Sequence, residues 1–430
     1  MTAFSSIYTS LTGMLSYSDA LDVLSNNIAN LNTPGFKGDD VLFRDLPPNN
    51  PDLEGGSGNM PLVPIGNGSE FFGTKLDFSE GPFQSTGNAT DLSINGAGFF
   101  VLNDNGQQVF SQAGQFTFDS NGYLIDSTTK SRVQGYVNGS TSLSDIQIPP
   151  NSVNAATPTT IVNFSGVLGV ASSSSTTTPT NPSATISNVI DSSGKAHTLT
   201  VTFTQDTSTA TGTGTTSSSQ TVWDISVTED NGQTVSVFPP SITYGADNNP
   251  ESGSDSVQVD LNGQEITLAF GTESGGSGTT SASGTSTISG TANGSVAGTL
   301  TGITFNQNGV AQLAYSNGNT VQGPQIAVAT FADPNQLINI GTSLFQANPA
   351  EPGGTPAFGL PGSGGYGQIQ PGQLELSNVN LSDEFSLIVV LQNGYQGSSQ
   401  ILQVSNQLLS DLYSSTGGQG GGSNSASSGD

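Results

Sequence analysis

The chain has 430 residues and carries 33 acidic against 6 basic side chains, which gives a formal net charge of −27. This one-signed balance argues against binding to nucleic acid and against docking on anionic lipid, because both need clustered Lys or Arg. The chain has no Cys, so disulfides and thiolate metal sites are excluded. A chain of this length can form two or three domains, each with its own core.

The N-terminus lacks the basic and apolar regions of a cleaved secretory signal. The longest strongly apolar run, residues 387–391, is too short to cross a bilayer. We therefore expect neither a cleaved signal peptide nor insertion into a membrane.

Residues 1–36 are predicted to form a helix with a narrow heptad seam. Apolar residues recur at alternating steps of three and four once Ser18 and Ser25 fill two positions. Pro34 and Gly35 then end the helix. The apolar members of this seam are Phe4, Ile7, Leu11, Met14, Leu21 and Ile28.

A second helix with the same pattern is predicted over residues 382–415. Ser398 and Ser405 interrupt its seam, whose other members are Ile388, Leu391, Tyr395, Leu402, Leu409 and Leu412. Small polar residues reduce the apolar area that each helix buries, so either helix should be marginal alone. Two interpretations stay open: the helices close a globular domain within one chain, or they become ordered when neighbouring copies add contact area. Periodicity alone favours the first.

Between these helices the sequence is typical of β-structure. Residues 37–73 are rich in Pro, Gly and Asn and are predicted to be an extended connection. From Thr74 onward, short apolar runs alternate with hairpin turns such as Asp104-Asn105-Gly106. Residues 74–140 and 323–381 are predicted to form one discontinuous inner β-domain.

Residues 141–322 are predicted to be an inserted outer β-domain. Residues 198–204 and 222–227 alternate as half-buried strands do, whereas residues 207–219 and 271–296 have the low complexity of surface loops with little fixed structure. The tail 416–430 is predicted to be disordered. The predicted fold is mainly β, with discontinuous β-domains nested between coiled-coil-like α-helices at the two ends.

The sequence offers no arrangement of residues for catalysis. His197 is the only histidine, which excludes a multi-His metal centre, and with no nucleophile motif nearby we expect it to be an ordinary surface residue. Gly96-Ala97-Gly98 fits a turn better than a phosphate-binding loop. We predict no enzyme activity, no cofactor and no metal site.

Three segments resemble the flagellar axial proteins, the family of rod, hook and hook-associated proteins. Residues 25–37, with the sequence SNNIANLNTPGFK, are similar to the N-terminal signature of that family. Residues 374–381, Glu384 and residues 392–396 resemble its C-terminal signature, and residues 81–101 resemble the β-domain shared by hook and distal rod proteins. The three segments occur in the expected order.

The long insert is typical of the hook proteins within this family, and the segment from Phe331 to Leu337 also resembles them. Two features depart from the pattern: the Gly/Ser tail after Ser415 and the low content of Lys and Arg. Neither departure touches the signatures.

The resemblance implies a structural subunit that self-assembles into a tubular helical polymer of the extracellular flagellar hook and acts as a flexible universal joint transmitting torque from rod to filament. Its implied partners are further copies of itself, the distal rod, the hook cap, the hook–filament junction proteins and the type III export apparatus, with no nucleic acid and no membrane insertion. A distal rod or hook-associated role, or a secreted surface adhesin, is the alternative.

Within this hypothesis the polymerisation interface lies on the terminal helices. Asn26, Asn27 and Asn30 are candidates for hydrogen bonds between chains, because they cluster at a helix end. The remaining interface residues come from the two seams: Ile7, Leu11, Met14, Leu21, Ile28, Ile388, Leu391, Tyr395, Leu402, Leu409 and Leu412.

Overall fold

A computed structural model describes residues 2–47, 66–137, 139–170, 181–206, 220–271 and 278–417. The chain divides into two units: unit 1 comprises residues 1–150, 303–312 and 322–430, and unit 2 comprises residues 151–302 and 313–321. The predicted loop 207–219 and most of the predicted tail, residues 418–430, lie outside the described residues. The limits of the predicted domains remain predictions.

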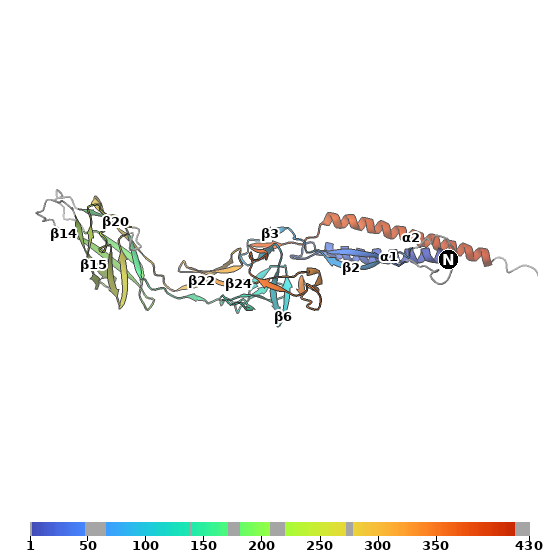
Figure 1. Cartoon of the computed structure of the whole chain (residues 1–430), viewed down its shortest axis with the longest axis horizontal. Coiled ribbons are helices and arrows are strands. Elements are labelled where there is room, and N and C mark those ends of the chain that lie inside the picture. Colours follow the sequence, from blue (N-terminus) through green and yellow to red (C-terminus); the bar gives the residue numbers. More distant parts are fainter. Residues whose placement is uncertain are drawn as a thin grey trace, which may run out of the picture. The chain divides into compact units, whose positions relative to one another are not determined.

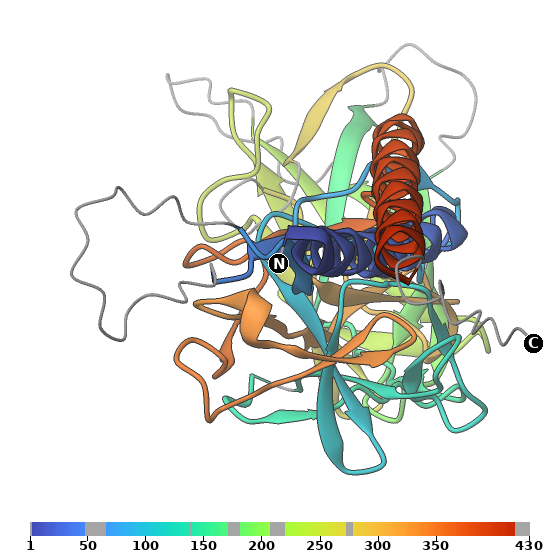
Figure 2. The ribbon, with the colours of Figure 1, turned by 90° about the vertical axis from the view of Figure 1, so that its right-hand side faces the viewer.

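The predicted fold class is confirmed: β-structure is flanked by one helix at each end of the described chain. Helix α1 (Thr2–Ala29) and helix α2 (Leu381–Gly417) lie against each other in unit 1 (Figures 1 and 2). The side-chain oxygen of Asn380 accepts a hydrogen bond of 3.0 Å from the backbone N–H of Ser382, which caps α2. Acidic residues in the first turn of α2 also complement the helix dipole.

A two-stranded antiparallel ribbon packs on α1 within the segment that the sequence analysis predicted to be extended. It consists of β1 (Asp39–Asp45) and β2 (Ser69–Leu76). The side chains of these strands stay at least partly exposed, so the strands need no alternation of apolar and polar residues. Such alternation is the pattern by which a strand is recognised in a sequence. The sequence therefore gave little signal for the ribbon.

The β-domain of unit 1 closes by pairing strands from distant parts of the chain. Strand β25 pairs with β5, β27 with β6, β29 with β4, and β30 with β3. Its aromatic core includes Phe99 and Phe110, both buried, as expected for alternating strands. The bounds are β3 (Phe83–Ser85), β4 (Leu92–Asn95), β5 (Phe99–Asp104), β6 (Gln107–Ser111), β7 (Phe116–Phe118), β8 (Leu124–Asp126), β9 (Arg132–Tyr136), β10 (Leu143–Asp145), β25 (Val328–Thr330), η1 (Pro334–Gln336), β26 (Ile338–Gly341), β27 (Leu344–Gln346), β28 (Ala357–Gly359), β29 (Gln368–Pro371) and β30 (Gln373–Glu375).

Unit 2 contains a second sheet, in the order β13-β14-β15-β16-β18-β19-β12-β20. Its core gathers the alternating apolar residues of these strands, including Trp223 and Phe203. Strands β22 (Gly298–Phe305), β23 (Val310–Tyr315) and β24 (Thr320–Ile326) run across the limits between the units. The other bounds are β11 (Val153–Asn154), β12 (Ile161–Val170), β13 (Ser183–Ile190), β14 (Ala196–Asp206), β15 (Thr221–Glu229), β16 (Thr234–Phe238), β17 (Ser241–Tyr244), β18 (Ser256–Leu261), β19 (Gln264–Ala269), β20 (Gly278–Ser283) and β21 (Ser289–Ala292).

The prediction of a loop with little fixed structure over residues 271–296 is wrong for its described part, because β20 and β21 both pair with β12. Hydroxyl side chains of β20 can be buried because they form hydrogen bonds with the polar atoms of aromatic residues in the core. The Tyr244 hydroxyl lies 2.7 Å from Thr279 Oγ1, and Trp223 Nε1 donates to Ser281 Oγ at 3.1 Å. A Ser/Thr-rich composition therefore fits a buried strand here.

We expect Phe203→Ala to lower the free energy of unfolding of unit 2 by about 3–5 kcal/mol, because it empties space beside the rings of Phe164 and Phe270. Trp223 is the only tryptophan of the chain and is buried, so its fluorescence during urea unfolding reports on this unit. The control Val153→Ala alters a side chain that is 61% exposed and should change stability by less than about 0.5 kcal/mol. Equal effects of the two changes would contradict the assignment of Phe203 to the core.

Candidate functional site: the paired terminal helices

The two terminal helices meet around a small apolar cluster. Ala20, Leu24 and Leu391 are buried at its centre. Tyr17, Leu21, Val41 and Ile388 pack around them. Residues of α1, α2 and β1 thus share one core, and this core is narrow, as the interrupted seams predicted.

The buried face of α1 is displaced from the predicted seam. Apart from Leu24 it consists of small or polar residues, and its members also recur at steps of three and four: Ser10, Gly13, Ser16, Ala20, Leu24 and Asn27. Among the predicted seam residues, Ile7, Met14, Leu21 and Ile28 are half-buried, Leu11 is 45% exposed, and the side chain of Phe4 is outside the described set. The pattern gave the correct period on α1, and the predicted seam lies beside the most buried face of the helix.

Small residues form this face because the helices approach closely. A Cβ atom on Gly13 would lie 3.0 Å from Ser398 Oγ, and one on Gly394 would lie 2.6 Å from Tyr17 Cζ. Ser6 Oγ and Ser405 Oγ lie 3.0 Å apart across the pair. Hydrogen bonds and close backbone approach therefore replace much of the apolar burial of an ordinary helix pair.

On α2 the predicted seam and the face toward α1 largely coincide. Leu391 is buried, and Ile388, Leu402 and Leu409 are half-buried. Ser405, an interrupting residue, is also buried. Tyr395 and Leu412 remain 38% and 58% exposed.

The asparagines at the end of α1 differ in their surroundings. Asn27 is buried, and its side-chain amide donates to Asp39 O and to Glu384 Oε1, both at 3.0 Å, while its oxygen accepts from Asp39 N. Both amide hydrogens of Asn27 are used within the chain, and its contact with another chain remains a prediction. Asn26 and Asn30 bond to each other and line a cavity of about 230 Å³.

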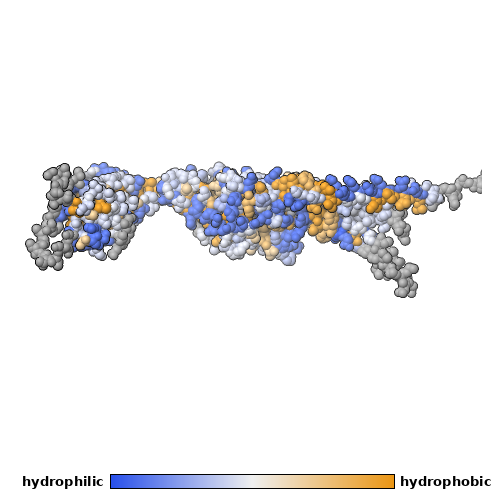
Figure 3. All heavy atoms as spheres, turned by 90° about the horizontal axis from the view of Figure 1, so that it is seen from above, coloured by the Kyte–Doolittle hydropathy of each residue, from blue (hydrophilic) through white to orange (hydrophobic). Residues whose placement is uncertain are grey.

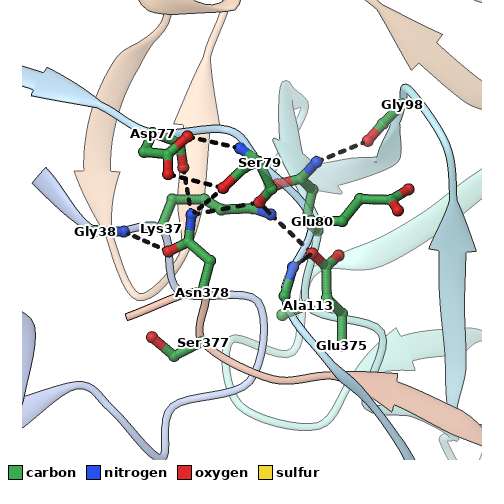
Figure 4. A network of polar contacts seen from close by, with 12 residues as sticks. Lys37, Gly38, Asp77, Ser79, Glu80, Gly98, Ala113, Glu375, Ser377 and Asn378 are labelled. Carbon is green, nitrogen blue, oxygen red and sulfur yellow. Dashed lines mark hydrogen bonds and ion pairs between the residues drawn. The ribbon is translucent and has the colours of Figure 1, made fainter. Parts of the chain in front are cut away.

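A buried ion pair joins the segments that follow α1 and precede α2 (Figure 4). Lys37 Nζ lies 2.7 Å from Glu375 Oε1 and donates to Ser79 O, also at 2.7 Å. Both side chains are almost fully buried, at 0% and 2% exposure. Glu375 Oε1 also accepts from Gly81 N at 2.8 Å. These bonds compensate for removing both charges from water.

Asn378 makes a second link between the two ends. Its side-chain oxygen accepts from Gly38 N at 2.9 Å, and its amide donates to Asp77 O at 2.7 Å (Figure 4). The sequence analysis did not single out Lys37, Glu375 or Asn378 for this role. One sequence feature could have indicated the ion pair: one of the six basic residues lies in the first signature and a glutamate lies in the second.

A stripe of exposed apolar residues runs along α2 beside its contact with α1. Its members lie on one side of the helix and are between 52% and 64% exposed: Leu387, Val390, Ile401, Val404 and Leu408. Helix α1 also exposes Tyr8, Leu11 and Leu15. Figure 3 shows hydrophobic residues beside hydrophilic ones along the helical end of unit 1. The sequence analysis did not identify this stripe.

Glu384 carries an unfavourable charge at the base of the helix pair. Burial raises the pKa of its carboxyl, the hydrogen bond from Asn27 opposes this, and the nearby carboxylates of Asp40 and Asp383 add to the rise. Glu384 Oε2 is buried without a hydrogen-bond partner in the described part of the chain. The neutral form of this side chain therefore suits the folded protein better than the charged form.

No described helix has the length and apolar character needed to span a membrane.

Three family models match the chain, in an order that places the helices at the ends. The model described as flagella basal body rod protein matches residues 7–37. The flagellar hook protein FlgE/F/G D1 domain matches residues 93–167, and the flagellar basal body rod FlgEFG protein C-terminal model matches residues 370–414. The first and third matches contain the two halves of the helix pair and its buried ion pair.

Several relatives match along almost their whole length. The flagellar hook protein FlgE of Borreliella burgdorferi is 27% identical, over 95% of this chain and 98% of that protein. The FlgE of Escherichia coli is 28% identical, over 94% and 98%. The flagellar basal-body rod protein FlgG of Bacillus subtilis is 23% identical, over 95% and 97%. A crystal structure of Helicobacter pylori flagellar hook protein FlgE2 superposes with a TM-score of 0.47 at 14% identity, covering 67% of this chain and 99% of that chain.

We expect Glu375→Gln to lower the free energy of unfolding of unit 1 by about 3–5 kcal/mol, because it leaves the buried ammonium of Lys37 without a countercharge. The loss of helix signal in circular dichroism during urea unfolding measures this effect. Glu70→Gln is a matched control, because it breaks the exposed pair with Arg44 and should cost less than about 1 kcal/mol. Similar costs for both variants would show that the buried pair has no special role.

Glu384→Gln should raise the thermal midpoint of the helix pair at pH 7, since glutamine keeps an oxygen for Asn27 and carries no charge. The folded-state pKa of Glu384 is raised, so wild-type stability falls as pH rises above the usual value of 4.5 and is restored below it. The advantage of the variant should therefore vanish at about pH 3, where the wild-type carboxyl is protonated. An equal advantage at both pH values would refute the electrostatic explanation.

Proposed function

Since the chain belongs to the family of flagellar hook proteins and is a structural subunit of the flagellar hook, we propose that its terminal helices form the contacts between successive subunits. The protein is located in the hook of the extracellular flagellum. The likeness to hook proteins along nearly the whole chain does not favour the rod or adhesin alternatives.

Long uncharged stretches in both helices support this proposal. The chain carries a net charge of −27, yet residues 1–18 and 385–410 contain no Asp, Glu, Lys, Arg or His. Like charges brought together in an interface cost several kcal/mol, so copies of a strongly acidic protein can stack only through surfaces from which charge is excluded. The uncharged stretches of the two helices, within residues 1–18 and 385–410, are such surfaces.

The exposed apolar stripe of α2 carries the proposal. A large aliphatic side chain contributes about 1.5–3 kcal/mol when it moves from water into an apolar contact. The monomer leaves Val390, Ile401, Val404 and their neighbours in the stripe largely exposed, while the seam between α1 and α2 is narrow and rich in serine. Assembly would therefore bury more apolar surface on these helices than the intramolecular pair does.

Contacts of this kind differ between the two partners, because the stripe on one chain meets a different surface on the next. Such heterologous contacts extend into a helical filament when the rotation between copies does not close a ring. We propose a tubular polymer that serves as a flexible joint and transmits torque from rod to filament. The polar, acidic surface of unit 2 suits contacts that slide during bending, since few apolar groups would have to separate.

The proposed interface keeps the predicted residues that the monomer leaves available, and adds the stripe. Asn26, Asn27 and Asn30 stay in it, with Asn27 also holding the end of α1 through its bonds to Asp39 and Glu384. Ile388, Leu391, Leu402 and Leu409 contribute by holding α2 against α1. Exposed members on both helices meet neighbouring copies: Leu11, Tyr395 and Leu412 from the seams, and Val390, Ile401, Val404 and Leu408 from the stripe.

Other partners follow from the place of the hook in the flagellum. We propose that the chain also meets the distal rod, the hook cap, the hook–filament junction proteins and the type III export apparatus. The family is structural, and the proposed role requires no catalytic group.

Val404→Asp should prevent polymerisation while leaving the monomer folded. The side chain is 61% exposed, so the change costs the monomer little, but it places a charge inside the proposed contact. Sedimentation and electron microscopy of the purified protein under polymerising conditions measure the effect. Leu21→Asp is a less selective test, because Leu21 also packs within the helix pair.

The neighbouring change Gln403→Asp is a matched control. It adds the same charge to an adjacent exposed position on the polar side of α2, away from the stripe. We expect polymers from Gln403→Asp and none from Val404→Asp, with the same circular dichroism spectrum for both monomers. Normal polymers from Val404→Asp would refute the stripe as a contact surface.

A further inference from the structure

The only histidine of the chain lies in a buried cluster of carboxylates in unit 2. His197 is 3% exposed, which corrects the prediction of an ordinary surface residue. It precedes Leu199, Val201 and Phe203, which alternate toward the core along β14, so it occupies a core-facing position at the end of that strand. Such a position is costly for an imidazole unless both ring nitrogens have partners.

The first partner is Asp191, in the turn between β13 and β14. Its Oδ2 lies 3.0 Å from His197 Nε2. Its Oδ1 accepts from Ser193 N at 2.9 Å, Ser193 Oγ at 2.6 Å and Lys195 N at 2.9 Å. The turn thus holds Asp191 as an acceptor, and an acceptor on Nε2 requires that this nitrogen carries the hydrogen.

The second ring nitrogen, Nδ1, faces another carboxylate. His197 Nδ1 lies 2.5 Å from Glu229 Oε1, yet it makes no hydrogen bond within the described part of the chain. Glu229 Oε2 is engaged by the amide of Asn231 at 2.9 Å, which fixes the carboxylate in place. A nitrogen and a carboxylate oxygen at this distance repel each other unless a proton or a metal ion lies between them.

A third ligand completes the cluster. Asp230 follows Glu229 at the start of the turn between β15 and β16, and single ligand atoms of His197, Glu229 and Asp230 all lie within 4.8 Å of one another. Metal-binding histidines usually donate from one ring nitrogen to a carboxylate and bind the metal through the other nitrogen. In His197 these would be Nε2 and Nδ1. Asp191 supplies the outer carboxylate here.

We propose that His197 Nδ1, Glu229 and Asp230 bind one divalent transition-metal ion, with zinc as the best match to one imidazole and two carboxylates. Zinc takes nitrogen and oxygen ligands at about 2.0–2.2 Å, which places two tetrahedral ligand atoms roughly 3.3 Å apart. Glu229 needs to move back by less than about 1 Å from Nδ1 to reach that spacing. Water would complete the coordination.

The site is open to ions from solution. Asp230 is exposed, and the side chain of Glu229 is 9% exposed, whereas His197 closes the inner side. The net charge of −27 also raises the local concentration of cations. A bound ion would tie the start of β14 to the hairpin of β15 and β16, and would therefore stabilise unit 2 without any change in its fold.

The test uses the full-length protein, first stripped with a chelator and then titrated with Zn²⁺. Unfolding is followed by the fluorescence of Trp223, which lies on β15 in the same unit as the site. We expect Zn²⁺ to raise the thermal midpoint, and Co²⁺ to give the visible absorption of a tetrahedral site. Glu229→Gln should weaken Zn²⁺ affinity at least tenfold, and Asp191→Asn, which alters only the outer carboxylate, by about 10–100-fold.

Glu265→Gln is the matched control, because it removes an exposed carboxylate of β19 in the same unit and should leave the response to Zn²⁺ unchanged. A chelator-treated protein with no shift on adding Zn²⁺ would overturn the proposal. The same shift in Glu229→Gln as in the wild type would also overturn it. A midpoint that ignores metal but falls between pH 5 and 8 would show that a proton, and not a metal, bridges His197 and Glu229.

Discussion

The buried pair of Lys37 and Glu375 is the interaction on which the arrangement of the two helices depends. It lies where the chain leaves α1 and where it enters α2, so it fixes both helices to the same point of the β-domain. Ion pairs of this kind cost several kcal/mol in desolvation and persist only where further hydrogen bonds compensate, as Ser79 and Gly81 do here. The pair anchors the chain on both sides of the helix pair, in addition to the close contacts of Gly13, Gly394 and Ser405 between the helices.

The small-residue contact between the helices explains which of their features could be predicted from the sequence. The helices, their period and the α2 face were predictable, since apolar residues mark them. The α1 face was not, because close approach selects glycine, alanine and serine, and these residues carry no apolar signal. On α1, Leu11 and Leu15 point to solvent in the monomer while Ser10 and Ser16 are buried. Apolar periodicity on α1 therefore marked a surface that the single chain buries only in part.

The same reasoning applies to unit 2. Strand β14 was visible from alternation, but β20 was not, because its core contacts are the hydroxyls of Thr279 and Ser281. Likewise, the surroundings of His197 depend on a turn and on the end of another strand, and no spacing in the sequence brings these together. Contacts between polar groups from distant segments are therefore the part of a site that sequence patterns predict least well.

The pairing of distant strands in unit 1 also has a consequence for how the protein forms. Phe83 pairs with Glu375 in one sheet and Phe100 with Val328 in another, so the β-domain that receives both helices cannot close until the last quarter of the chain is available. The ten-stranded sheet of unit 2, whose strands β12 to β21 pair among themselves, has no such requirement. Non-local pairing of this kind slows folding, because the entropy of loop closure is lost before any contact is gained. In a growing chain, the ten-stranded sheet of unit 2 should therefore fold before the β-domain and the helix pair of unit 1.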